Sequence, residues 1–318
     1  MTSGNGASPP VSWLWVDSED LVEASREALA AAEVLAVDTE YDSLRYFREK
    51  LCLVQVCDGK TVYLFDPLSG LDLRFLGKLF RDPAILKILH AGDNDIRLFH
   101  RDFGFVFRNI FDTHRAASVL GCPFLSLAHL LEVYLGLTVP KSKRMQRSKW
   151  EARPLAEDQL LYAARDAFLL FDLHERLKNE LEDQGLLEQA GETFQSLESI
   201  RWREKSYNPG GFQRLEGFDD LDDREKARLK RLFLWRFEKA RETNMARFII
   251  LSDEALMALC RHFPADIHAL GRTGILSSRQ LKRFGKDIVA LLSAVPPAPA
   301  LESDHERSSS SLPESREA

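Results

Sequence analysis

Cysteine is scarce in this chain and is scattered along it. Four cysteines occur, Cys52, Cys57, Cys122 and Cys260, and no two of them form a CxxC pair. This pattern argues against a zinc knuckle and against a disulfide framework. It is typical of a protein that works in a reducing compartment.

Long apolar runs are also missing. Nowhere do eighteen consecutive apolar residues occur, and the opening "MTSGNGASPP" has neither a basic region nor an apolar one. We therefore expect a cytoplasmic protein that is neither exported nor membrane-embedded. We expect residues 1–11 to form a flexible N-terminus.

An overall basic charge, which would indicate nucleic-acid binding, is absent as well, but the charge is unevenly distributed. The chain carries a formal net charge of −6 over 318 residues. Residues 222–294 hold 15 Lys/Arg against 9 Asp/Glu, or +6, while residues 1–221 carry −9 and the tail from 295 carries −3. The length suggests two domains at about 150 residues each, and the charge asymmetry indicates that they have different roles.

Periodicity predicts an α/β domain followed by helices. Short apolar or β-branched segments predict strands, and "CDGK" at 57–60 predicts a hairpin turn. The expected strands are 12–16, 34–40, 52–57 and 61–65, and a short apolar strand opens the segment 88–99. The expected helices are 18–31, 71–80, 94–102, 112–120, 126–135 and 157–182. Strands followed by helices around a mixed sheet indicate the α/β class. Residues 183–220 lose the pattern, 222–294 have helical spacing throughout, and 295–318 have the composition of a disordered tail.

Two acids follow a buried strand in "EVLAVDTEYDS", residues 33–43. Asp38 and Glu40 are two residues apart, so in a strand their side chains project from the same face. They form one oxygen-rich patch, and an unpaired charge there would be costly if buried. The alternative is a solvated strand end, because Asp-x-Glu is expected about once by chance in a chain of this length.

A third acid lies in a predicted apolar stripe. On a helix, Asp166 falls in line with Leu169, Leu170, Leu173 and Leu177, and Tyr162 lies one turn earlier on the same face. The Tyr162 hydroxyl and the Asp166 carboxylate could therefore address one site. A buried tyrosine hydrogen-bonded to an aspartate would explain the pattern equally well.

A fourth group of polar residues begins the predicted helix in "ILHAGDNDIRLF", residues 88–99. Asp93, Asn94 and Asp95 stand at the start of that helix. Ordinary N-capping would account for all three without any chemistry.

Taken together, these blocks resemble the DEDD 3′–5′ exonucleases, and most closely the ribonuclease D family. The matching segments are "VDTEYDSLRYFREKLCLVQV", "HAGDNDIRLF", "FDTHRAASVLG", "LAHLLEVYLGLTVPKSKRMQRSKWEARPL" and "YAARDA", and they span roughly residues 12–180. Tyr162, where other members carry His, indicates the tyrosine subgroup, DEDDy. The resemblance implies an RNase H-like exonuclease domain with a mixed sheet. We assign it to residues 12–195, with a linker over 196–220.

The C-terminal part resembles a helicase-and-RNase-D C-terminal (HRDC) domain. The matching segments are "LWRFEKARETN", "FIILSDEAL" and "FGKDIVALLSAV", and Ala246 stands where this domain usually has proline. We therefore expect an all-α HRDC-like domain over 221–294. It could bind RNA, or it could merely pack on the first domain.

The resemblance implies a site with two divalent cations, Mg²⁺ or Mn²⁺, which hard oxygen ligands select. Asp38, Glu40 and Asp166 would bind one ion, with Asp38 bridging to the second. Asp95 would hold that second ion, through water. Tyr162 would orient the attacking water, because a tyrosine with a pKa of about 10 is a poor base at neutral pH. Two such cations stabilise the attacking and leaving oxygens at phosphorus.

Substrate contacts are expected at four further positions. "KSKRMQRSKW" combines basic residues with Trp150, a pattern suited to phosphate contact and base stacking, although a solvated loop would look the same. Arg147 and Trp150 are our candidates from this segment, and the resemblance adds Phe47 and Gln55. The histidines show no metal-ligand spacing with one another.

The sequence thus predicts a 3′–5′ exoribonuclease that acts on RNA with a free 3′ end, such as tRNA precursors, and releases nucleoside 5′-monophosphates. Two alternatives stay open: a DNA exonuclease of the Werner type, and a non-catalytic RNA-binding adaptor. We expect no membrane association and no obligate protein partner.

Overall fold

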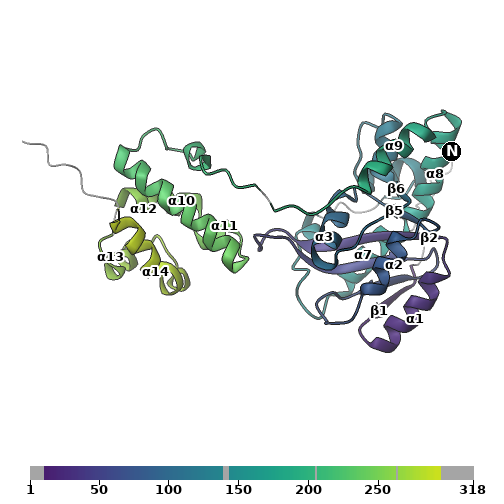
Figure 1. The fold of residues 1–318 in the computed structure, drawn as a ribbon, viewed down its shortest axis with the longest axis horizontal. Coiled ribbons are helices and arrows are strands. Elements are labelled where there is room, and N and C mark those ends of the chain that lie inside the picture. Colours follow the sequence, from purple (N-terminus) through teal and green to yellow (C-terminus); the bar gives the residue numbers. More distant parts are fainter. Residues whose placement is uncertain (1–10, 139–142, 205, 263, 295–318) are drawn as a thin grey trace, which may run out of the picture. The chain divides into compact units, whose positions relative to one another are not determined.

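The computed structural model describes residues 11–138, 143–204, 206–262 and 264–294 (Figure 1). These residues divide into two compact units. The first runs to Ser206 and includes Asn244–Ala246, and the second holds Tyr207–Thr243 and continues from Arg247. No helix in the described part of the chain is long and apolar enough to cross a membrane.

The first unit is an α/β domain built on one six-stranded mixed sheet. Its strands are β1 (Trp13–Val16), β2 (Val34–Asp42), β3 (Lys50–Cys57), β4 (Val62–Phe65), β5 (Leu86–Leu89) and β6 (Ile110–Asp112). The order across the sheet is β1-β4-β3-β2-β5-β6. β3 runs antiparallel to both of its neighbours, and the other pairs are parallel.

Helices cover both faces of this sheet (Figure 1). They are α1 (Glu19–Ala30), α2 (Arg74–Arg81), α3 (Asp93–Phe103), α4 (Thr113–Val119), α5 (Leu127–Leu135), α6 (Lys143–Gln146), α7 (Glu157–Phe168), α8 (Leu170–Asp183) and α9 (Leu187–Leu197). Alternation along β2 decides which residues meet which layer. Leu35 and Val37 pack with α1, α2 and α3, while Ala36 packs with α7 on the opposite face.

Helix α7 lies against the middle of the sheet, in contact with β2, β3 and β4. The close approach is possible because three of its residues, Ala163, Ala164 and Ala167, are small and fully buried. Since α7 carries both Tyr162 and Asp166, this packing positions them over β2.

The single helix expected over 157–182 is wrong, because the chain breaks at Leu169 into α7 and α8. The predicted stripe is divided as a result. Leu170 joins the α7 layer, while Leu169, Leu173 and Leu177 pack with α4, α5 and α9. Strand β6 and helix α9 were not expected from the sequence.

The second unit is helical. It contains α10 (Asp223–Thr243), α11 (Arg247–Ile250), α12 (Asp253–His262), α13 (Ile267–Arg272), α14 (Ser278–Ser293) and a 3-10 turn, η1 (Gly211–Arg214). α10 packs against α12 and α14, and η1 also contacts α10. The expected linker is therefore divided: Leu197 is buried in the core of the first unit, whereas Phe212 packs on Phe233 of α10.

Candidate active site

Three acids from two elements meet on one face of the sheet. Asp38 and Glu40 project from β2, and Asp166 projects from α7, which covers that face. Ligand oxygens of these three carboxylates all lie within 4.8 Å of one another. This is the only such group of three or more His, Cys, Asp or Glu side chains among the described residues that could hold a metal ion.

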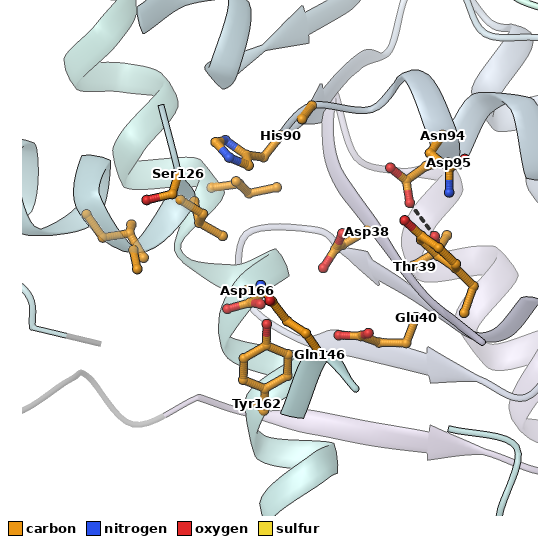
Figure 2. Close-up of a pocket in the computed structure, with 16 residues that line it drawn as sticks. Asp38, Thr39, Glu40, His90, Asn94, Asp95, Ser126, Gln146, Tyr162 and Asp166 are labelled. Atoms are coloured by element: carbon orange, nitrogen blue, oxygen red, sulfur yellow. Dashed lines mark hydrogen bonds between the residues drawn. The ribbon is translucent and has the colours of Figure 1, made fainter. Parts of the chain in front are cut away.

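The acids open into a cavity of about 480 Å³. Figure 2 shows Asp38, Glu40, Asp166 and Tyr162 directed toward one space. Tyr162 and Asp166 lie four residues apart on one face of α7, so the hydroxyl and the carboxylate face the same part of the cavity. The cavity therefore combines clustered carboxylate oxygens with the phenol of Tyr162.

The fourth acid reaches the cavity from the other side of β2. Asp95 lies in the first turn of α3, and its carboxylate accepts a hydrogen bond from the Thr39 hydroxyl, drawn as a dashed line in Figure 2. Thr39 points away from Asp38 and Glu40 because successive strand residues alternate. Asp95 lines the same cavity but lies outside the group of three.

Burial makes this cluster electrostatically strained. It raises the pKa of Asp38 well above its ordinary value, and the charges of Asp95 and Asp166 raise it further. Burial likewise raises the pKa of Glu40, with Asp38 the strongest contributing charge. Carboxylates in this state either take up protons or bind cations.

The other two acids shift in the same direction. Burial raises the pKa of Asp166 to about 7, against the opposing effect of the Tyr162 hydrogen bond. It raises the pKa of Asp95 to about 6, against the hydrogen bond from Thr39. Burial, followed by the charge of Asp166, raises the pKa of Tyr162 above its ordinary value, so the phenol stays protonated at neutral pH.

The expected substrate contacts do not lie in the cavity. Gln55 and Trp150 are both fully buried in this structure, so neither side chain is exposed for direct contact with a nucleotide. Phe47 is half-buried under the Arg48 guanidinium, and Arg147 is exposed, but neither lines the cavity. Their substrate contacts stay predictions.

Gln146 lines the cavity but was not predicted from the sequence. It ends α6, a helix of one turn that is too short to show periodicity, so no pattern distinguishes it from its neighbours. His90 also lines the cavity. Burial and the neighbouring His114 lower its pKa to about 4, and its Nδ1 is 2.9 Å from the Thr113 hydroxyl oxygen.

Comparison with known proteins decides the family. Residues 14–182 match the family model described as a 3′-5′ exonuclease, and residues 225–292 match the HRDC domain. Ribonuclease D of Escherichia coli (strain K12) is 32% identical over 278 residues, which are 87% of this chain and 73% of that protein. The chain belongs to the ribonuclease D family of 3′–5′ exonucleases.

Solved structures agree with this membership. The crystal structure of Escherichia coli RNase D matches with a TM-score of 0.67 at 31% identity, covering 91% of this chain and 76% of that one. The catalytic core of RRP6 from Trypanosoma brucei has the same fold, with a TM-score of 0.82 at 21% identity and coverage of 89% and 79%. The structure of Brucella melitensis NrnC with bound Mg²⁺ matches with a TM-score of 0.51 at 26% identity, over 60% of this chain and 90% of that chain. The RNase H-like exonuclease fold and the helical HRDC domain expected from the sequence are thus confirmed.

Proposed function

We propose that this protein is a 3′–5′ exoribonuclease that hydrolyses the terminal phosphodiester of RNA with the help of two divalent cations. The observation that carries the proposal is the meeting of Asp38, Glu40 and Asp166 within 4.8 Å, in a cavity that also contains Tyr162. Membership of the ribonuclease D family supports the direction of attack and the choice of RNA.

The donor set fits hard divalent cations. All of the ligands are carboxylate oxygens, which favour Mg²⁺ or Mn²⁺ over softer metals. Asp38, Glu40 and Asp166 would hold one ion, Asp38 would be shared with the second, and Asp95 would serve the second through water. Bound cations would neutralise the developing charge on the attacking and leaving oxygens.

Tyr162 has a positioning role in this proposal. Its raised pKa means that it cannot take a proton from water at neutral pH. A neutral phenol next to Asp166 can instead accept a hydrogen bond from the attacking water, or donate one to it. Either bond would fix the direction of the water. The resulting product is a nucleoside 5′-monophosphate.

RNA with a free 3′ end is the proposed substrate, and tRNA precursors in the cytoplasm are the proposed physiological class. The second unit would contribute phosphate contacts, since residues 222–294 carry +6. Basic side chains on α14, at Lys282, Arg283 and Lys286, are our candidates for those contacts.

Side-by-side digestion of matched RNA and DNA oligonucleotides tests the proposal. With Mg²⁺, we expect 5′-monophosphates to appear from the 3′ end of the RNA, no products in EDTA, and no products from RNA blocked by a 3′-phosphate. Faster digestion of DNA would favour the Werner-type alternative. RNA binding without any hydrolysis in Mg²⁺ or Mn²⁺ would favour the adaptor.

A further inference from the structure

Gln55 is a buried amide without a hydrogen-bond partner in the part of the chain that the structure describes. Its side chain lies in β3 and is 0% exposed. Neither Oε1 nor Nε2 has a hydrogen-bond partner among the residues that the structure describes. An amide buried in this way lowers the stability of the fold unless it is paired.

The position of Gln55 relates it to the candidate metal site. In the antiparallel pairing of β2 with β3, Gln55 is directly opposite Asp38. Side chains at such positions share a face of the sheet, with their Cβ atoms about 4.5–5.5 Å apart. Asp38 is thus the directly opposite neighbour of the amide on β2.

The other residues around the amide are apolar or weakly polar. Leu64 is its partner on the opposite strand, β4, and Leu53 and Cys57 precede and follow it on the same face of β3. Buried alanines of α7 cover this layer. Among the sheet residues directly opposite Gln55 or next to it along this face of β3, only Asp38 carries a strong hydrogen-bonding group, and Glu40 is a more distant, diagonal neighbour.

We propose that Gln55 is a positioning residue for Asp38, with Nε2 donating a hydrogen bond to the Asp38 carboxylate when the site holds its cations. The inference rests on the proposed function, in which Asp38 is shared between two ions. A shared carboxylate must keep both oxygens directed, and a fixed N–H donor beside it restricts its rotation. An ionised carboxylate accepts hydrogen bonds only, and the amide has two N–H groups to give.

A second buried group complements the acceptor side of the amide. The indole Nε1–H of Trp150 is also without a partner among the described residues, although Trp150 is fully buried. Trp150 belongs to the same apolar cluster as Leu53 and Cys57, the residues that flank Gln55 on its face of β3. The indole N–H is a hydrogen-bond donor and Gln55 Oε1 is an acceptor, so the two groups are complementary.

Gln55→Met tests the inference, because it removes the amide while keeping the length of the side chain. The full-length variant and the wild type are titrated with Mn²⁺ by calorimetry and melted in EDTA. We expect Mn²⁺ affinity to fall by about ten- to a hundredfold, the usual cost of losing a hydrogen bond to a metal ligand. The melting temperature in EDTA should stay the same or rise, because an unpaired buried amide has been removed.

Leu53→Met is the matched control. Leu53 is equally buried on the same face of β3 and lies opposite Glu40, but it has no polar group. The Leu53→Met variant should bind Mn²⁺ with the affinity of the wild type. If Gln55→Met does not fold, Gln55→Leu replaces it in the same titration.

Two outcomes would overturn the inference. One is wild-type Mn²⁺ affinity in the Gln55 variant, and the other is a lowered melting temperature in EDTA with unchanged affinity, which is the signature of a purely structural amide. RNA hydrolysis by the wild type is measured on the same preparation. A wild type that binds Mn²⁺ without cutting RNA contradicts the proposed function, while the comparison of affinities still decides the role of Gln55.

Discussion

Each acid in the cavity is destabilising in the metal-free protein, because it is buried among like charges. Replacing Asp38 or Asp166 by Asn keeps the shape and removes one charge. We expect Asp38→Asn and Asp166→Asn to lose hydrolysis in Mg²⁺ while their melting temperature in EDTA is unchanged or raised. Nuclease assays and thermal melts measure both, and near wild-type turnover in either variant would make the proposed metal site wrong.

The phenol of Tyr162 acts, in our proposal, on water and not on the fold. Tyr162→Phe keeps the ring, which lies 6.2 Å from the Trp150 ring between centroids, and deletes the hydroxyl. We expect a rate loss of roughly a hundredfold or more, the scale expected when one positioning group is removed, with RNA binding largely kept. Single-turnover rates measure the effect on hydrolysis, and a binding isotherm measures the effect on RNA binding. Weaker binding at unchanged turnover would indicate a substrate contact instead.

The raised pKa values make stability depend on pH in a defined direction. Asp166 has a pKa of about 7 in the folded protein and about 3.9 when unfolded, so between these values the folded state binds the extra proton. Stability in EDTA therefore falls as pH rises from about 4 through 7. We expect the melting temperature in EDTA to drop from pH 5.5 to pH 8, and to drop less in Asp166→Asn. Added Mg²⁺ should raise it more at pH 8 than at pH 5.5, and equal drops in the two proteins would contradict the assignment.

Individual residues differed in how far the sequence could place them. Periods of two and of 3.6 residues place Asp38 with Glu40 on one face of a strand and Tyr162 with Asp166 on one face of a helix. Only the resemblance to the ribonuclease D family joins these two pairs into one expected site. The burial of Gln55 and Trp150 could not be predicted from the sequence, because it depends on the packing of α7 over β3. A local segment such as "KSKRMQRSKW" holds no information about which of its residues that packing will cover.

At the scale of elements, α7 decides the geometry of the site. Ala163 is fully buried between α7 and the sheet, next in sequence to Tyr162. Ala163→Leu should destabilise the fold by about 1–3 kcal/mol through overpacking, and should also move Tyr162 and Asp166 away from β2. We expect turnover to fall at least tenfold at a temperature where the variant is still folded, as circular dichroism and nuclease assays can show.

Ala116→Leu is the control for that variant. Ala116 is equally buried, but it lies in α4 within the separate cluster formed with α5 and α8. It should lower stability similarly while turnover is kept. Equal losses of turnover in the two variants would mean that overpacking anywhere in the domain impairs the site, and that α7 has no special role.

The elements that the sequence could not define have physical causes. β6 is three residues long, too short for any period to be recognised. The break between α7 and α8 falls in an unbroken helical pattern without glycine or proline, so only the division of its leucines between two clusters accounts for it. α9 is amphipathic, with Ala190, Phe194 and Leu197 as its buried residues, but Gly191 in its interior weakens the helical signal in the sequence.

At the scale of the whole molecule, charge is divided between the two units. Residues 1–221 carry a net charge of −9, so their surface outside the cavity is expected to repel RNA. Residues 222–294 carry +6. Capture of long RNA is then expected to depend on the helical unit. In α14, Lys282, Arg283 and Lys286 are all exposed and lie within about one turn of one another.

Replacing these three α14 residues by Ala in the full-length chain tests that dependence. We expect weaker binding to long structured RNA and a flatter plot of log affinity against log salt, by about 0.7–0.9 for each phosphate group that is no longer bound. Hydrolysis of a very short oligonucleotide should be unchanged, because the acids and Tyr162 all belong to the first unit. The control replaces Arg74, Lys78 and Arg81 on α2 by Ala. These residues are also exposed, and their replacement removes the same amount of charge from the chain. They lie on a helix that packs on the sheet face opposite α7. Identical salt slopes for the α14 variant and the wild type would mean that these residues do not bind RNA. A slope reduced equally by both variants would attribute the effect to net charge alone.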